Sequence, residues 1–322
     1  MGRRSILALS LALLIGPSGW ADLTLRHKME IKFASFLPAE AQAQARQQAG
    51  AALPNEMVVR IKGDKTYTNS GPLFAITDYG RGAITLLNPK TNQYAEVPLA
   101  EYPDRIAASQ KPPAIPPEAQ AMLQSLRFDV ETKKTGQIGL VQGIQAEESV
   151  VTLSIQMPAA AGAASAMRLE MRYWIAQPSE IRRVPALQEL ADYAERTRRA
   201  MDPSEMPQKV FAQMPGFGEQ LRASIQELQK ANSGLVLKLH TAIYVPAMAQ
   251  ALQLAPQGAA GVDSNAAVAE FQMDLADIST AALPDSLFAV PADYKAAPFE
   301  ELTKALIQAP PPLPAAQPKR GQ

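Results

Sequence analysis

LTLRHKMEIKF, at residues 23–33, is the stretch that decides the fold class of this chain. Apolar side chains alternate along it with charged or polar ones, so that one side of an extended backbone is apolar and the other is charged. A period of two residues is typical of a strand with one buried face. The stretch therefore predicts a half-buried β-strand, and His27 falls on its apolar side.

The same alternation recurs along much of the chain, interrupted by turn residues. Gly63-Asp64, for example, is a favourable hairpin turn between two such runs. Strands are expected at residues 57–62, 65–69, 74–79, 83–87, 93–97, 128–132, 138–142, 148–157, 167–175, 235–245 and 271–275. Helical spacing of apolar residues appears at 118–126, 185–232 and 298–308, whereas 38–53 suits a surface helix or a mobile excursion. The pattern predicts an α+β fold built on a long antiparallel sheet, with helices on one side.

The first 21 residues predict export. Met1 to Arg4 form a short positive region, Ser5 to Pro17 are almost purely aliphatic, and Gly19 and Ala21 are small, as a signal peptidase requires. Cleavage is expected between Ala21 and Asp22. The alternative is a membrane anchor, but the apolar run is shorter than the roughly 20 residues that cross a bilayer. A lipoprotein is excluded because no cysteine is present to carry the lipid. The protein is therefore expected to be periplasmic or secreted, with no stable membrane span after cleavage.

Composition narrows the classes of function further. The absence of cysteine excludes disulfides, thiolate catalysis and cysteine-ligated metals. Lys+Arg 31 balances Asp+Glu 31, which argues against nucleic-acid partners and anionic membrane surfaces. We expect one domain at 22–308 with a helical insertion at about 185–232, followed by a disordered proline-rich tail at 309–322.

The residues of common catalytic motifs are missing. His27 and His240 are the only histidines, and HExxH spacing, a GxSxG elbow, a phosphate-binding glycine loop and a dinucleotide fingerprint are all absent. His27 is interpreted as a half-buried, hydrogen-bonded histidine, and His240 as an exposed one. No catalytic residue, metal site or cofactor is predicted. The remaining enzymatic alternative is a hydrolase with carboxylate chemistry, which would require Asp or Glu side chains that converge in one cleft.

Methionine recurs on the faces expected to point inward. Because its side chain is flexible and polarizable, methionine suits an adaptable apolar cavity, although ordinary core filling explains the same pattern. The residues predicted to line such a cavity are Met29, Ile31, Met57, Val59, Leu153, Met157, Leu169, Met171, Leu239, Phe271 and Met273.

Several short motifs in sequence order resemble those of one superfamily. They are Ala75–Gly80, Ile84–Pro89, Tyr94–Pro98, Gly139–Ala146, Tyr173–Ala176 and Phe288–Lys295. With them the chain resembles the outer-membrane lipoprotein carrier superfamily, the LolA-like proteins, and more closely a related family of exported bacterial proteins that is itself uncharacterised. The resemblance extends over nearly the whole chain after the signal peptide, and each motif is degenerate.

The resemblance implies an incomplete, half-open β-barrel, formed by a curved antiparallel sheet with helices packed on or in its concave side. It also implies a hydrophobic or lipidic ligand, such as an acyl chain, a lipid or a lipoprotein, bound in the hollow without catalysis. The carriers have an arginine inside the cavity, for which Arg60 and Arg172 are the candidates here. The insertion at 185–232 and the proline-rich tail depart from the compact carriers.

An alternative function is an envelope protein that docks a protein partner and uses its sheet only as a scaffold. The helical insertion or the proline-rich tail would then carry the contact. An exposed apolar patch formed by Phe211, Met214 and Phe217 would favour this alternative.

Overall fold

The computed structural model describes residues 22–52, 54–69, 71–109, 126–156, 167–200, 226, 234–246 and 266–307. Several sequence predictions fall outside these described residues. They are the signal peptide at 1–21, all but the last residue of the helix expected at 118–126, the cavity residue Met157, almost all of 201–232 with Phe211, Met214 and Phe217, and the tail at 309–322.

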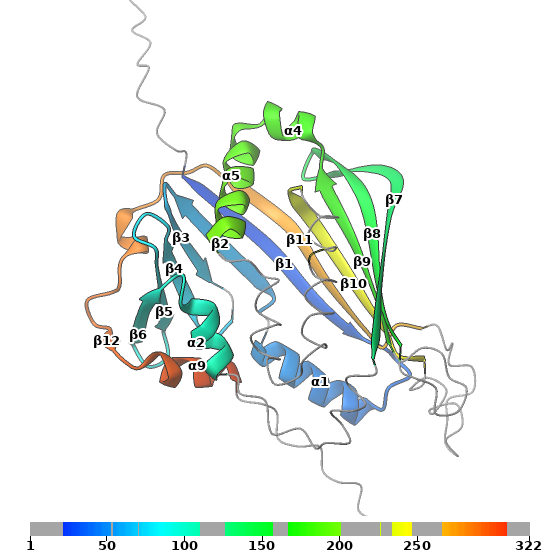
Figure 1. The fold of residues 1–322 in the computed structure, drawn as a ribbon, viewed down its shortest axis with the longest axis horizontal. Coiled ribbons are helices and arrows are strands. Elements are labelled where there is room, and N and C mark those ends of the chain that lie inside the picture. Colours follow the sequence, from blue (N-terminus) through cyan, green and yellow to red (C-terminus); the bar gives the residue numbers. More distant parts are fainter. Residues whose placement is uncertain are drawn as a thin grey trace, which may run out of the picture.

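The strands form one twelve-stranded, unclosed sheet (Figure 1). In spatial order they are β12 (Lys295–Ala296), β6 (Gln93–Pro98), β5 (Ala83–Asn88), β4 (Phe74–Asp78), β3 (Lys65–Asn69), β2 (Glu56–Lys62), β1 (Leu23–Phe33), β11 (Ala269–Ser279), β10 (Val236–Tyr244), β9 (Met167–Ala176), β8 (Ile144–Gln156) and β7 (Arg127–Val141). Neighbours are antiparallel except β12, which pairs parallel to β6. The sheet is therefore mixed, and the antiparallel prediction is wrong at that edge. An unclosed sheet is compatible with a half-open barrel.

The first strand lies in the middle of the sheet. β1 pairs with β2 on one side and with β11, from the far end of the chain, on the other. Its alternation matches the expectation: Leu23, Leu25, His27 and Met29 are buried, and the residues between them are exposed or half-buried. We call the side of the sheet that carries these four residues the apolar face, and the opposite side, which carries Lys28 of β1, the polar face.

Helices cover part of the sheet. They are α1 (Ala39–Ala52), α2 (Tyr102–Ser109), α4 (Pro178–Arg183), α5 (Pro185–Ala200) and α9 (Phe299–Ile307), and a 3₁₀ turn, η1, spans Asp285–Phe288. α5 and α9 lie within segments that the sequence predicts as helical. α1 lies in the segment 38–53, for which the sequence allows a surface helix or a mobile excursion. α2 occupies part of a connection for which no helix is expected.

Three apolar clusters hold the described elements together. The central cluster joins β1, β2, β8, β9, β11 and the start of β10 to α5, whose Leu187 is fully buried. The edge cluster packs α2 and α9 against β5 and β6. The β8–β9 cluster consists of Val151, Leu153 and Met171 with partly buried neighbours. Because a fully buried leucine contributes about 1.5–3 kcal/mol, these contacts fix α5 against the sheet.

Candidate functional site

The predicted cavity residues lie on one continuous face of the sheet. Across the strands, Met29 of β1 pairs with Met273 of β11, and Met273 pairs with Leu239 of β10. Leu239 pairs with Tyr173, and Tyr173 with Ser149 of β8. This row crosses five strands. The predicted residues in the described ranges therefore come from adjoining strands of a single surface.

The same residues differ in how they are packed. Val59 belongs to the central cluster and Met57 packs against it, whereas Leu153 and Met171 form part of the β8–β9 cluster, with Leu169 and Leu239 against it. A second group belongs to none of the three clusters. It consists of buried Met29 and half-buried Ile31, Phe271 and Met273. We call these four residues the apolar strip.

The apolar strip is built from two directly paired couples on β1 and β11. Met29 lies opposite Met273, and Ile31 lies opposite Phe271. Because opposite side chains in an antiparallel pair are about 4.5–5.5 Å apart at Cβ, each couple forms a contact unit. The strip lies between the central cluster and the β8–β9 cluster.

His27 is the titratable residue at the edge of this surface. Its side chain is buried, and its Nδ1 atom has no hydrogen-bond partner among the described residues. Burial disfavours the charged imidazolium and lowers the pKa of His27 from 6.5. The predicted position on the apolar side is confirmed, but the prediction that the histidine is fully hydrogen-bonded is wrong at Nδ1.

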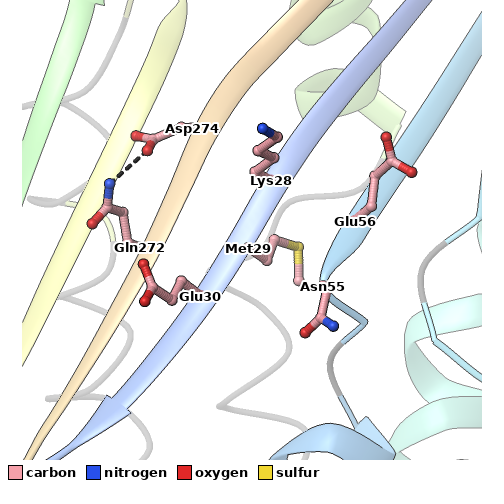
Figure 2. Close-up of a pocket in the computed structure, with 7 residues that line it drawn as sticks. All are labelled: Lys28, Met29, Glu30, Asn55, Glu56, Gln272 and Asp274. Atoms are coloured by element: carbon pink, nitrogen blue, oxygen red, sulfur yellow. Dashed lines mark hydrogen bonds between the residues drawn. The ribbon is translucent and has the colours of Figure 1, made fainter.

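A pocket of about 500 Å³ opens where β1 and β2 diverge (Figure 2). Backbone pairing of the two strands ends near Met29, whose N–H donates to the carbonyl of Asn55 at 2.8 Å. Polar residues form most of the wall, and Met29 contributes its side chain from the apolar face. The lining residues are Lys28, Met29, Glu30, Asn55, Glu56, Gln272 and Asp274. Sequence reasoning identified only Met29 of this set, because the others read as ordinary solvated positions.

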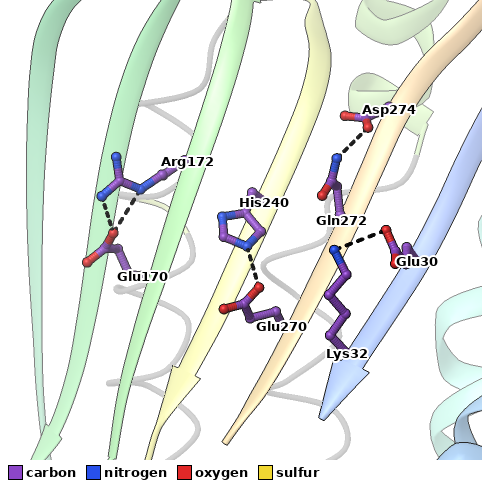
Figure 3. A network of polar contacts seen from close by, with 8 residues as sticks. All are labelled: Glu30, Lys32, Glu170, Arg172, His240, Glu270, Gln272 and Asp274. Carbon is purple, nitrogen blue, oxygen red and sulfur yellow. Dashed lines mark hydrogen bonds and ion pairs between the residues drawn. The ribbon is translucent and has the colours of Figure 1, made fainter. Parts of the chain in front are cut away.

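The polar face carries ion pairs and hydrogen bonds on strands β9, β10, β11 and β1 (Figure 3). Arg172 pairs with Glu170 at 2.6 Å, and His240 lies 3.4 Å from Glu270. Hydrogen bonding to Glu170 raises the pKa of Arg172 further. Arg172 therefore lies on the polar face. Arg60, directly opposite Thr24, shares that face and packs over the ring of Tyr67. Neither candidate for a cavity arginine is on the apolar face, and that assignment is wrong.

A second pocket, of about 600 Å³, contains several carboxylates near η1. Asp285 pairs with Lys62 at 2.8 Å, and Asp78 lies 3.7 Å from Lys65. The hydrogen bond from Lys62 lowers the pKa of Asp285 and raises that of Lys62. Asp285 is thus held ionised by a lysine, an arrangement suited to joining η1 to β2 rather than to proton transfer.

Two negative findings apply to the described ranges only. No group of three or more histidine, aspartate or glutamate side chains there is arranged to hold a metal ion. In the same ranges, no helix is both long and apolar enough to cross a membrane.

Comparison with known proteins gives only distant similarity. No protein-family model and no curated protein matches the chain. Among solved structures it is similar to LppX, a lipoprotein of Mycobacterium tuberculosis, with 9% sequence identity over 78% of this chain and 83% of that chain. The TM-score is 0.25, which is too low to support a conclusion on fold or function. Function must therefore be inferred from the residues of this chain.

Proposed function

We propose that this protein is exported to the periplasm or secreted, and that it binds a hydrophobic or lipidic ligand on the apolar face without changing it chemically. The helices would cover the concave side of a half-open barrel, and the ligand would lie between them and the sheet. An acyl chain, a lipid or an acylated protein fits this description.

The observation that supports the proposal is the apolar strip. Met29, Ile31, Phe271 and Met273 form two facing couples, yet they belong to none of the three clusters formed by the described residues. An acyl chain laid along them would gain about 0.8 kcal/mol for each buried methylene group. Because methionine side chains change rotamer readily, the strip suits chains of different length.

The absence of a chemical step is part of the proposal. In the pocket near η1, where several carboxylates converge, Asp285 is neutralised by Lys62 and Asp78 lies close to Lys65. A general acid must instead be protonated near the working pH. The arrangement thus favours a binding role over carboxylate catalysis.

Native mass spectrometry of protein purified gently from its own compartment, followed by organic extraction, tests the proposal. We expect a co-purifying lipid or acylated molecule. Met273→Lys, which places a charge in the strip, should abolish uptake of a fluorescent fatty acid. Gln272→Lys is the matched control, since residue 272 is adjacent but lies on the polar face. The proposal would be overturned if the native mass equals that of the protein without any ligand and the wild type also fails to take up the fluorescent fatty acid.

The second candidate is docking of an envelope protein, and one observation favours it. Ile138 and Leu140 are 61% and 71% exposed on β7, an edge strand with an unpaired side in the described sheet. Exposed aliphatic residues on a sheet edge are typical of sites where another strand adds. Crosslinking from residue 138 in the intact envelope tests this candidate. A specific adduct that is lost in Ile138→Lys/Leu140→Lys would support it, whereas no adduct would count against it.

A further inference from the structure

Four side chains with soft donor atoms gather beside the pocket at β1 and β2. His27 lies directly opposite Met57 of β2, and Met29 lies directly opposite Met273 of β11. His27 and Met29 are two residues apart on β1 and share the apolar face. Opposite Cβ atoms are about 4.5–5.5 Å apart, and residues two apart on a strand are separated by about 7 Å. One nitrogen donor and three thioethers therefore occupy adjacent positions on the apolar face of three neighbouring strands.

The imidazole of His27 is buried without a hydrogen-bond partner for Nδ1 among the described residues. The residue is 9% exposed. At least about nine in ten buried polar groups are satisfied, so an unpaired nitrogen held in a buried position indicates a missing partner. The cross-strand neighbours of His27, Met57 and Leu275, offer no strong donor or acceptor.

The backbone at His27 is also irregular. The pairing of β1 with β11 shifts register between Arg26 and His27, which leaves Ala276 as an extra residue. A bulge of this kind re-aims the side chains beside it and is frequent next to functional sites. It brings Leu275 opposite His27 and keeps Met273 opposite Met29. The irregularity thus coincides with the soft donors.

We propose that His27, Met29, Met57 and Met273 form a binding site for a soft monovalent metal ion, Cu⁺. Thioether ligands select Cu⁺ over hard cations such as Mg²⁺ and Ca²⁺, which take carboxylate and carbonyl oxygen. Neutral imidazole is a common metal ligand.

The pocket of Figure 2 reaches one of the four proposed ligands, Met29. Met29 is 8% exposed and lines that pocket, so its side chain borders solvent-filled space. Glu30, Glu56 and Asp274 stand on the pocket wall, each within 3.4 Å of a basic side chain. A hydrated cation would enter past these carboxylates and exchange water for thioether ligands at Met29.

The inference does not depend on the proposed ligand of the apolar strip. It uses two of the same methionines, but for their sulfur atoms rather than for their apolar surface. Replacing methionine by leucine conserves volume and apolarity and removes the donor. Leucine variants therefore separate metal binding from lipid binding, which should persist in them.

The test is competition for Cu⁺ between the purified protein and a chromophoric Cu⁺ chelator such as bicinchoninate, without oxygen and with ascorbate. We expect the wild type to withdraw one equivalent. Met29→Leu and Met273→Leu should each weaken binding by about tenfold or more, since even indirect partners of a metal ligand change affinity about 10–100-fold. Met171→Leu is the control, because residue 171 shares the apolar face but lies three strands from β1.

Three outcomes would overturn the proposal: no Cu⁺ uptake by the folded wild type, unchanged affinity in Met29→Leu/Met273→Leu, or equal weakening by Met171→Leu. His27→Leu adds a second measurement, and its circular dichroism spectrum shows whether it folds. If it is folded and binds as tightly as the wild type, His27 is not a ligand. Fatty-acid probe binding in the leucine variants reports separately on the proposed function.

Discussion

Gly139 of β7 lies against the indole ring of Trp174 in β9, so closely that a Cβ at residue 139 would stand 2.5 Å from Cζ3 of the ring. Between them runs β8, where Ala146 pairs with both Gly139 and Ala176. Ala146 is fully buried. A small residue on β8 and glycine on β7 thus allow the ring to extend across two neighbouring strands, which ties the sheet edge to the central cluster.

We predict that Gly139→Ala destabilises the protein by about 1–3 kcal/mol, because an added methyl group must displace a large, half-buried ring. Guanidinium denaturation followed by far-UV circular dichroism measures the loss. Trp174→Phe provides the matched control. If the ring contact is the cause, Gly139→Ala should cost less in the Trp174→Phe background. If the losses of unfolding free energy caused by the two substitutions simply add in the double variant, the ring contact is not the cause.

A second prediction concerns Tyr79, which joins the β4–β5 turn to α5. Its hydroxyl lies 2.9 Å from Oγ1 of Thr197, and its ring meets Tyr193 edge-on. Tyr79→Phe should lower the free energy of unfolding by about 0.5–1.5 kcal/mol, the usual contribution of one hydrogen bond. Hydrogen exchange should show faster opening of α5. Unchanged exchange in α5 would mean that the central cluster alone positions this helix.

The same tyrosine predicts a dependence on alkaline pH. Burial is the largest cause that raises the pKa of Tyr79 above 10. The folded state then binds its proton more tightly than the unfolded state does, so stability present below pH 10 is lost as pH rises toward the folded pKa. Denaturation between pH 9 and pH 11 should show a shallower loss in Tyr79→Phe than in the wild type. Tyr67 and Tyr102, whose pKa values burial also raises, would leave a residual slope. Equal slopes would refute the assignment.

A further prediction concerns the free energy of unfolding at acidic pH, which should depend on His27. Because burial lowers its pKa below 6.5, the unfolded state binds the proton more readily. His27 therefore costs stability as pH falls from about 6.5 through the folded pKa. Between pH 7 and pH 5, the wild type should lose more unfolding free energy than His27→Leu. His240→Gln is the control and should retain the loss that His27 causes. A wild type and His27→Leu with identical pH profiles would show that His27 protonates freely in the fold.

The strands could be predicted from sequence because alternation is a local property. Residues 23–33 form β1 over the predicted bounds, and Gly63, at φ 56°, supplies the turn between β2 and β3. The order of the strands is not local. Nothing within β1 indicates that its partner is β11, which follows more than 200 residues later in the chain. The central position of β1 therefore had to come from the structure.

For the candidate site, too, the sequence predicts the local features but not those that depend on strand pairing. Alternation placed Met29 and Met273 on inward faces, but their direct pairing depends on register, and the bulge at Ala276 leaves no signature in the sequence. Asn55 and Asp274 in the pocket read as surface residues until β1 and β2 are seen to diverge. Likewise, α2 contains Pro103 and lies in a proline-rich connection, and its Ile106 is buried as part of the edge cluster.

The last prediction concerns Asp22, the residue expected to begin the chain after signal-peptide cleavage. Its Oδ2 accepts a hydrogen bond from the backbone N–H of Leu283 and lies 3.8 Å from Nζ of Lys62. β1 begins at the next residue, Leu23, which is fully buried. Cleavage after Ala21 would thus leave every contact of β1 intact, whereas cleavage a few residues later would remove buried leucines.

N-terminal sequencing of the exported protein should accordingly start at Asp22. Asp22→Ala should lower the free energy of unfolding by about 1.5–3 kcal/mol, the range for a hydrogen bond to a charged group, and should speed hydrogen exchange in residues 283–288. Asp64→Ala is the matched control, because the Asp64 side chain is exposed. The hydrogen bond that Asp64 accepts from the N–H of Tyr79 is made by its backbone carbonyl and is kept in the variant. A mature chain that starts beyond Leu25 would contradict the predicted site, because the central cluster would then lose both leucines that β1 contributes.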